Sequence, residues 1–441
     1  MLPYIEPKTR ASVSDDMSGM PSVDKQNKDD MLINNLVYRQ PVDLSLAKSR
    51  THVKQFFQRS DYSSASSKTG ICDWNTGSSY INCSNSFLVF EMEIKNTTEA
   101  VTYTFGKGSA MNIINRLNIR TKSGSEVERL DYVPLWSRVD TEYSCDKDYK
   151  ESVMSLAGRG RTLLLSTPSF SYTYKFAIPL ERLAPFFRPL KGQLMPPQLA
   201  SGLHIEIVFE DVVNIAKYQV GAVPTSHDIK NIHFLLDQVD LSDEAQKAIS
   251  VESAETGLEW VTPRVYSVQT SLASGVTSAS VQIRKAVSQA TKAYSVPQGV
   301  NQYNAATQDA TASIVFPQSI KFQYNLGSLY FPNQEVVDNV ATAPVSCFLE
   351  ALYAFDKTKD GLKSSDIPIT DFSTGSAILA MTSSRDNQLY LSGLNINNSR
   401  ALQFKGEFVW ENVDTGAHLI TSFLEYMQVV KCYNDQSVVA I

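Results

Sequence analysis

Short runs in which apolar and polar side chains alternate recur along most of this chain. The clearest examples are Ser86–Ile94, Leu203–Glu210 and Ala401–Trp410. A period of two places successive side chains on opposite faces of a strand, so one face enters a core while the other stays exposed, as in antiparallel sheets. No catalytic motif accompanies these runs. A chain that spends its length on strands and loops without site chemistry is better suited to a building role than to catalysis.

The bulk composition indicates a well-packed protein with more than one core. At 441 residues the chain is long enough for two or three domains, or for two large β-sandwiches. Hydrophobic residues make up 43% and aromatic residues 10%, which is ample for stable cores. Charged residues make up 20%, below the usual ~25%. The low value fits a surface that is partly covered by other copies of the chain, and large β proteins often have a similar value.

The charge of the chain argues against nucleic-acid binding. Its formal net charge is −6 and its pI is about 5.5, so the chain as a whole does not attract anionic partners. Residues 1–50 hold seven basic and seven acidic side chains, and an arm without net charge does not condense a phosphate backbone. We therefore expect weak or no direct binding to nucleic acid.

The cysteines, the apolar segments and the first residues indicate the cellular compartment in which the protein is made. The five cysteines form an odd set without C-x-x-C spacing, so the sequence predicts neither a zinc site nor a disulfide framework. Because no motif for a cofactor is recognised either, no cofactor is expected. No apolar run reaches 18 residues, so no membrane span is expected. The start, Met1–Pro7, lacks the basic and apolar regions of a signal peptide. We expect the protein to be made and kept in a reducing compartment.

The first half of the chain is predicted to consist of an arm, a loop and a series of strands around one helix. Residues 1–50 are expected to form an extended arm, and the Ser- and Gly-rich stretch from Ser60 to Ser79 a loop. Apolar residues at helical spacing predict one helix over Tyr132–Tyr143. The expected strands are Phe87–Lys95, Ala100–Phe105, Leu117–Thr121, Glu126–Leu130, Tyr172–Ile178, Leu203–Glu210 and Ile232–Leu241.

The second half repeats this plan. An imperfect capping box at Ser242 predicts a short helix over Asp243–Ile249 between the halves. A further helix is expected over Ser346–Phe355, and little helix is expected elsewhere. The predicted strands are Glu259–Gln269, Ser280–Arg284, Ile314–Tyr324, Ala377–Met381, Gln388–Leu391, Leu402–Trp410 and Ile420–Cys432.

Each half thus has about eight strand candidates, one helix in a loop near its middle, and two long strands near its end. The two halves match in the order of their elements, although no repeat is visible at the level of residues. A module of this size with eight strands fits a double-sheet jelly roll. We therefore predict an all-β chain with an arm over residues 1–50 and two tandem eight-stranded jelly rolls over residues 51–245 and 246–441, with short helices inserted in loops.

Three stretches carry a resemblance to a known family. They are Gly108–Leu117 continuing into Arg120–Glu126, the proline corner Pro185–Pro189 leading to Met195–Pro197, and Gly327–Gln334. Together with the two predicted jelly rolls, they make the chain resemble the double jelly-roll major capsid proteins of icosahedral DNA viruses. Within that group it looks most similar to the capsid proteins of Polinton-like viruses and virophages. The architectural match covers about residues 50–441 and carries more weight than the motifs.

The resemblance implies how the protein would assemble. Members of this family form homotrimers with a pseudo-hexagonal outline that tile icosahedral facets, with sheets standing upright and inserted loops forming towers and lateral contacts. It implies the virion capsid as the location, with assembly inside the host cell. The implied partners are other copies of the chain, neighbouring capsomers, penton proteins and minor capsid proteins.

Four segments invite comparison with known sites. His204, Glu206 and Glu210 share one side of their strand and could begin a metal site, but no second histidine cluster accompanies them, so an outward polar face is expected. Phe105–Ser109 superficially resembles a phosphate-binding loop, but its spacing fails and a turn is expected.

The other two segments are short loops. Gly158–Arg161 is a compact basic patch for which a structural or subunit-contact loop is expected rather than a nucleic-acid site. Asp356–Gly361 lacks the alternating acids of a calcium loop, so a solvated turn is expected.

These observations favour a capsid protein without catalytic, cofactor-binding or metal-binding residues, and hence no enzyme. Two rival interpretations come from other classes. One is a carbohydrate-binding protein of two β-sandwiches, and the other is a glycoside hydrolase whose carboxylates are too dispersed to recognise. The size of the purified protein distinguishes them, because a trimer or shell-like particles favour the capsid and a monomer favours the rivals.

Overall fold

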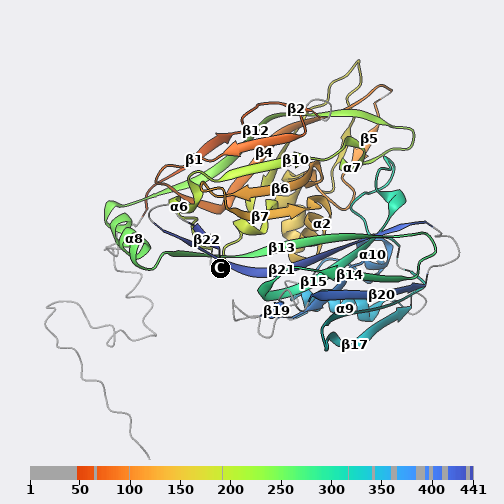
Figure 1. Cartoon of the computed structure of the whole chain (residues 1–441). Coiled ribbons are helices and arrows are strands. Elements are labelled where there is room, and N and C mark those ends of the chain that lie inside the picture. The colour runs from red at the N-terminus through yellow and green to blue at the C-terminus, as the bar shows by residue number, and fades with distance from the viewer. Residues whose placement is uncertain are drawn as a thin grey trace, which may run out of the picture. The chain divides into compact units, whose positions relative to one another are not determined.

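The structure is a computed structural model of the whole chain. It describes residues 47–63, 67–98, 100–190, 192–315, 317–339, 343–358, 365–383, 393–396, 401–409, 416–433 and 438–440. The strands of these residues fall into separate antiparallel sheets, and each sheet draws its strands either from before residue 242 or from after residue 257. The helix α8, Asp243–Glu255, connects the two groups (Figure 1).

Before α8, two four-stranded sheets face each other. One has the order β1-β12-β4-β9 and the other the order β3-β10-β6-β7. The bounds of these strands are Ala47–Phe56 (β1), Thr69–Asp73 (β3), Tyr80–Asn96 (β4), Ile114–Arg120 (β6), Glu126–Asp131 (β7), Tyr174–Pro179 (β9), His204–Phe209 (β10) and Pro224–Leu241 (β12). Short strands decorate this unit, namely β2 (Tyr62–Ser63) on β12 and a small sheet of β5 (Thr102–Thr104), β8 (Thr162–Leu164) and β11 (Lys217–Tyr218).

After α8, the arrangement is repeated. One sheet has the order β13-β21-β15-β18 and the other the order β14-β20-β16-β17. The bounds are Leu258–Leu272 (β13), Ser278–Ile283 (β14), Val287–Gly299 (β15), Ser319–Leu326 (β16), Leu329–Asn339 (β17), Leu379–Thr382 (β18), Leu402–Val409 (β20) and His418–Cys432 (β21). Two short strands are added, β19 (Leu394–Ile396) on β15 and β22 (Val438–Ala440) on β21.

The two units share one topology. When the principal strands of each described unit are numbered one to eight along the chain, both units have one sheet in the order 1-8-3-6 and a second in the order 2-7-4-5. This is the strand order of a jelly roll, in which the strands of a folded ribbon alternate between two sheets. The prediction of two tandem eight-stranded jelly rolls is therefore confirmed. We call them the first and the second jelly roll.

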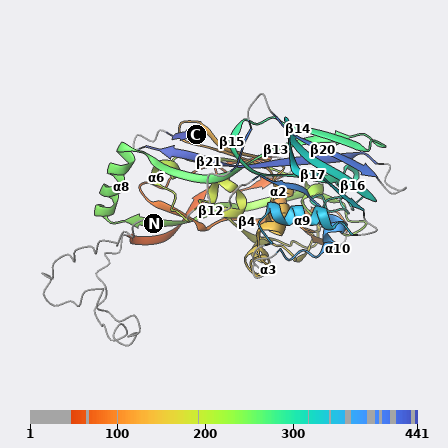
Figure 2. The same ribbon diagram turned by 90° about the horizontal axis from the view of Figure 1, so that it is seen from below.

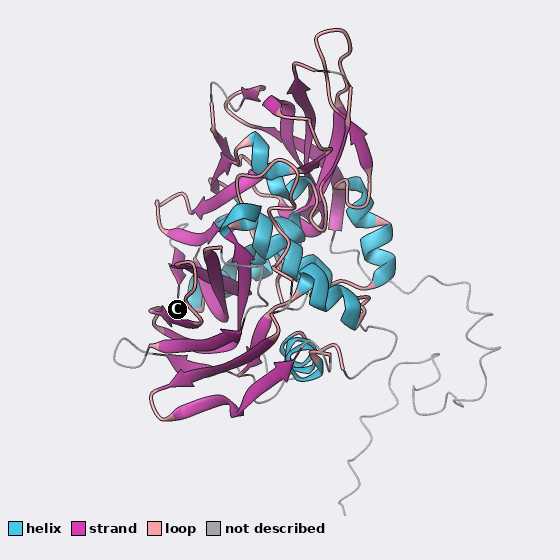
Figure 3. Ribbon diagram, turned by 90° about the vertical axis from the view of Figure 1, so that its right-hand side faces the viewer, coloured by secondary structure: helices cyan, strands magenta, loops and turns pink. Residues whose placement is uncertain are grey.

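Each jelly roll also carries a helix between its fifth and sixth strands. In the first jelly roll this is α2, Val133–Ser144, and in the second it is α9, Val345–Ala354. Both helices were predicted from the sequence, α2 from the helical spacing of its apolar residues. Figure 3 shows helices lying between the strand-rich upper and lower parts of the molecule.

The helix content exceeds the expectation of three short helices. The helix α8 runs six residues beyond its predicted end at Ile249, and several single-turn helices occupy the long connections. They are α3 (Lys147–Glu151), α4 (Val153–Leu156), α5 (Leu180–Leu183), α6 (Pro197–Ala200), α7 (Val212–Ile215), α10 (Ile369–Asp371), the 3₁₀ helices η2 (Ala110–Ile113), η3 (Pro185–Phe187) and η4 (Val300–Gln302), and the π-helical turn η7 (Phe372–Ser376). Helices this short have no periodic sequence signal because they complete only one or two turns.

Of the sixteen principal strands described above, β1, β3, β15 and β17 were not predicted. The first four residues of β1 were assigned to the arm, and no strand was expected over β17. The expected loop over Ser60–Ser79 contains β3. This strand was not recognised because it has few apolar residues and lies in a segment rich in serine and glycine. Gly70 in this strand lies against the rings of Phe57 and Phe209, which take the space of a side chain. The strand β15 was missed because most of its second half is buried on both faces, so its residues do not alternate. The expected strand over Gln388–Leu391 lies outside the described residues.

The core of each jelly roll lies between its two sheets. Among the residues described, the largest fully buried side chains include Trp74, Trp136 and Trp260. All five cysteines are buried, and burial raises the pKa of their thiols. In the described part of the chain, no helix is long and apolar enough to cross a membrane.

Candidate functional site: contact surfaces of the two jelly rolls

The helix α2 forms the centre of the junction between the jelly rolls. Arg138 is fully buried there and donates hydrogen bonds to the carbonyl oxygens of Thr311, at 3.0 Å, and Ser376, at 3.3 Å, both in the second jelly roll. Its charge is balanced by Glu142 one turn later, at 2.9 Å. Tyr143 donates its hydroxyl hydrogen to the same Ser376 carbonyl at 2.8 Å. The buried polar face of α2 is thus hydrogen-bonded across the junction.

A tight turn of the first jelly roll adds to this junction. The backbone N–H of Lys107 donates to the Asp309 carboxylate at 2.7 Å, and its Nζ donates to the Ser376 hydroxyl at 2.7 Å. Gly106 precedes it with a φ of 61°, and a Cβ at Gly106 would lie 2.0 Å from Asp309 Oδ2. Only glycine fits this position. The predicted turn over Phe105–Ser109 is confirmed, and its lysine binds a carboxylate and a hydroxyl of the second jelly roll.

Two edge strands also meet at the junction. The strand β7 ends one sheet of the first jelly roll, β13 ends one sheet of the second, and the two are in contact. Arg264 Nε on β13 lies 3.5 Å from Oε1 of the fully buried Glu128 on β7. Burial raises the pKa of Glu128 to about 7, although the neighbouring Arg264 opposes this. An acidic side chain on β7 therefore faces a basic side chain on β13.

The proline corner Pro185–Pro189, which is one of the three stretches that carry the family resemblance, lies beside β13. The indole N–H of Trp260 on β13 donates to the Phe186 carbonyl at 3.1 Å. Close by in the first jelly roll, Arg182 and Arg188 donate hydrogen bonds to buried Asp140 on α2, at 2.9 Å and 2.8 Å. These two guanidinium groups hold the pKa of Asp140 well below its usual range against the effect of burial. The corner Pro185–Pro189 thus positions α2 and β13 together.

The three polar residues of strand β10 do not form one site. His204 Nδ1 lies 2.6 Å from a carboxylate oxygen of Asp73, whereas Glu206 lies 3.5 Å from the Asn118 amide. Glu210 was expected on the outward face but is buried, because the chain turns after β10 and carries it into the junction. There it accepts a hydrogen bond from Asn115 at 2.6 Å. No cluster of metal-ligating side chains occurs among the residues that the structure describes.

The two remaining candidate segments are loops. In Gly158–Arg161, Arg159 donates to the Lys107 carbonyl at 2.7 Å, whereas Arg161 is exposed. Of Asp356–Gly361, only the first three residues are described, and within them Lys357 Nζ lies 2.9 Å from the Asp146 carboxylate of the first jelly roll. Arg159 and Lys357 therefore have structural partners that the sequence pattern did not show.

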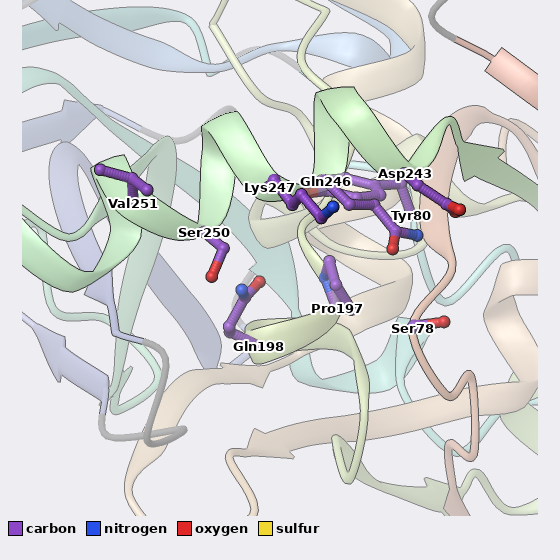
Figure 4. Close-up of a pocket in the computed structure, with 9 residues that line it drawn as sticks. All are labelled: Ser78, Tyr80, Pro197, Gln198, Asp243, Gln246, Lys247, Ser250 and Val251. Atoms are coloured by element: carbon purple, nitrogen blue, oxygen red, sulfur yellow. The ribbon is translucent and has the colours of Figure 1, made fainter.

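A groove of about 770 Å³ lies beneath α8, between this helix and the first jelly roll (Figure 4). Its walls include Tyr80, Pro197 and Gln198 on one side and Gln246, Ser250 and Val251 of α8 on the other. Most residues of α8 are exposed or half-buried, so the helix packs only loosely on the body of the protein. None of the junction residues named above lines this groove.

The counterparts of the two edge strands at the junction are exposed. The strand β1 has the place of β13 in the first jelly roll, and eight of its ten residues are exposed. The strand β17 has the place of β7 in the second, and seven of its eleven residues are exposed. Next to β17, α9 exposes the apolar residues Val345, Leu349 and Tyr353, which share one helix face because they are four residues apart.

No protein-family model matches the sequence, and no curated protein matches it by sequence. Solved structures do match the fold. The major capsid protein Vp54 of PBCV-1, fitted into a reconstruction of the virophage Sputnik, is 11% identical with a TM-score of 0.60, covering 92% of this chain and 98% of that chain. The Faustovirus major capsid protein is 8% identical with a TM-score of 0.60, covering 90% and 92%. The mavirus major capsid protein is 10% identical with a TM-score of 0.50, covering 99% and 97%.

The chain has the double jelly-roll fold of these viral major capsid proteins. The similarity extends over both jelly rolls, since each match covers at least nine-tenths of both chains. At identities of 8–11% it shows the fold. Within this double jelly-roll fold, the junction centred on α2 is the contact that joins the first jelly roll to the second.

Proposed function

We propose that this protein is a major capsid protein that forms homotrimers, which tile the shell of an icosahedral DNA virus. The observation that carries the proposal is the repeated strand order of the two jelly rolls. Because both have the orders 1-8-3-6 and 2-7-4-5, one chain presents two similar building blocks side by side. Three such chains in a ring offer six similar positions, which is the number that hexagonal packing of capsomers requires.

The structural neighbours support the same role. The three solved structures named above are capsid proteins, and they match this chain over nearly its whole length. The polar hydrogen bonds at the α2 junction support a fixed arrangement of the two jelly rolls, which a repeating shell needs. We further propose residues 51–245 and 246–441 as the two assembly units, and residues 1–50 as an arm that contacts neighbouring subunits. These bounds come from the sequence, and the first lies within β1 and the second within α8.

The role we propose is structural rather than catalytic. The titratable side chains at the junction serve contacts, since Arg138, Glu142 and Lys107 all have partners that bind the jelly rolls together. The location we propose is the virion capsid, with penton and minor capsid proteins as further partners. The net charge of −6 favours a shell that does not condense its genome directly.

The test is the mass of the purified full-length protein. Size-exclusion chromatography with multi-angle light scattering at micromolar concentration should give three times the 49.0-kDa mass of the chain. Negative-stain micrographs should show particles with a hexagonal outline. A monomer at that concentration would refute the proposal and favour a two-domain binding protein or a hydrolase.

A further inference from the structure

The second jelly roll has an exposed edge, where β17 pairs with β16 on one side and with no described strand on the other. The strand β17 is the last strand of its sheet, and its exposed apolar residues include Val337, which is 52% exposed. The neighbouring helix α9 buries Cys347, Ala351 and Ala354 on one face. Its opposite face carries Val345, Leu349 and Tyr353. We call Val337, Val345, Leu349 and Tyr353 the donor patch.

A helix that is apolar on both faces is typical of a buried position, so the donor patch points to a covering partner. The composition of α9 shows this clearly, since eight of its ten residues are apolar. The contrast with the first jelly roll is informative. The helix α2 occupies the same place in the strand order, and ten of its twelve residues are buried because the second jelly roll covers it.

The first jelly roll has the complementary exposed edge. The strand β1 ends its sheet and exposes Phe56 to 65%. In the second jelly roll the strand in this place is β13, of which only two of fifteen residues are exposed, since the first jelly roll covers it. We call the exposed surface of β1, including Lys48, Lys54 and Phe56, the acceptor edge.

Resting on the proposed function, we infer that the donor patch and β17 of one copy pack against the acceptor edge of a second copy. Within the chain, β7 packs against β13. The strand β17 is the fifth strand of the second jelly roll, as β7 is of the first, and β1 is the first strand of the first jelly roll, as β13 is of the second. A contact between β17 and β1 would therefore pair a fifth strand with a first strand again, this time between two copies. The contact between copies therefore continues the junction that already exists inside each chain.

Charge supports this choice of partner. Inside the chain the acid Glu128 is on β7 and the base Arg264 is on β13. Between copies the same signs recur, with exposed Glu335 on β17 and exposed Lys48 and Lys54 on β1. The two surfaces differ, so the contact is head-to-tail. Head-to-tail contacts form a closed ring when three successive rotations add up to a full turn, which is the arrangement that a trimer requires.

Two edge variants and a control test the inference. Val337→Asp/Leu349→Asp places charges in the donor patch, and Lys54→Glu/Phe56→Asp alters the acceptor edge. Val220→Asp is the control, because Val220 is 86% exposed and lies outside both surfaces. Both edge variants should elute as monomers in light scattering, with circular dichroism spectra like the wild type, and the control should stay trimeric.

The outcomes separate this inference from the proposed function. A monomeric wild type refutes the proposed trimer itself. A trimeric wild type whose edge variants also remain trimeric refutes only the contact inferred here.

Chemical cross-linking of the wild-type protein provides a test that does not depend on the folding of variants. A carbodiimide joins carboxylates to amines in direct contact. In the covalent dimer band we expect a peptide containing Glu335 joined to one containing Lys48 or Lys54, and Glu335→Gln should abolish that link. Covalent dimers that are linked only through other surfaces would overturn the inference.

Discussion

Arg264 and Glu128 meet between two edge strands, with their Nε and Oε1 atoms 3.5 Å apart and neither side chain more than 8% exposed. The ion pair joins β7 of the first jelly roll to β13 of the second. Figure 2 shows β13 from below, together with β21 and β15 of its own sheet. At this distance the pair lacks a close hydrogen bond, so burial dominates the behaviour of Glu128 and raises its pKa.

Glu128 should therefore make the junction more stable in mild acid than at neutral pH. Its pKa is raised from 4.5 to about 7, so between these values the folded chain binds the proton that the unfolded chain releases. Its stabilising effect is full below pH 4.5 and is lost as the pH rises through 7. As the pH rises from 4.5 to above 7, the wild type should therefore lose stability relative to Glu128→Gln, which carries no titratable group at this position. The loss in the free energy of unfolding should be at most about 3 kcal/mol.

Thermal denaturation at a series of pH values measures this difference. Below pH 4.5 the amide of the variant and the protonated acid of the wild type are similar, so the two proteins should melt close together. A difference in melting temperature that stays constant from pH 4.5 to pH 8 would show that Glu128 does not titrate in this way.

Arg138→Ala should be among the most destabilising single substitutions at the junction. It removes two hydrogen bonds to the second jelly roll and leaves the buried carboxylate of Glu142 without its cation. Breaking a buried pair from one side costs roughly 3–5 kcal/mol. Arg129→Ala, which removes an exposed pair with Asp131, is the matched control and should cost less than about 1 kcal/mol. Chemical denaturation of both variants measures the two costs, and equal costs would contradict the role of Arg138.

Most of the strands and the long helices could be predicted because their side chains follow one period. Strand β10 alternates without a break, with Ile205, Ile207 and Phe209 buried, because only one of its faces is covered. Helix α2 was found because apolar residues recur at helical spacing from Val133 to Tyr143. Where both faces are buried, as in much of β15, the alternation disappears and so does the signal.

The junction could not be predicted, since its residues come from distant parts of the chain. Arg138 and Ser376 are 238 positions apart, and neither belongs to a motif. Glu210 was misplaced because the pattern of β10 was extended one residue past its end. The exposed edge strands β1 and β17 were not predicted as strands, and their role as edges can be recognised only when each is compared with its covered counterpart.

The loop Gly158–Arg161 should not bind DNA. Arg159 is held by the Lys107 carbonyl at 2.7 Å, which leaves Arg161 as the exposed cation of this patch. We expect binding no tighter than millimolar near physiological salt, weaker than the ~10⁻⁴–10⁻⁶ M typical of non-specific binders. Fluorescence anisotropy with labelled duplex should show the same flat curve for the wild type and Arg159→Ala/Arg161→Ala. Micromolar binding that the double variant abolishes would make the loop a nucleic-acid site.

Deletion of residues 1–30 should separate trimer formation from shell formation. The described strands of the first jelly roll begin at Ala47, so both jelly rolls are retained in the shortened chain. We expect it to remain a trimer with the same melting temperature and to form fewer particles in electron micrographs. Loss of the trimer, or particles in normal number, would each contradict the role proposed for the arm.

His227 should oppose Glu128 in the pH dependence of stability. Its side chain is buried in β12, and burial lowers its pKa from 6.5 to about 4. Between these values the unfolded chain binds a proton that the folded chain does not, so stability is lost as the pH falls through this window, by at most about 3 kcal/mol. In the wild type the two effects partly cancel between pH 5 and 6.5. His227→Gln should therefore become more stable as the pH falls from 7 to 5, whereas Glu128→Gln should become less stable. Melting temperatures of both variants across this range measure the signs, and profiles that run parallel to the wild type would refute both assignments.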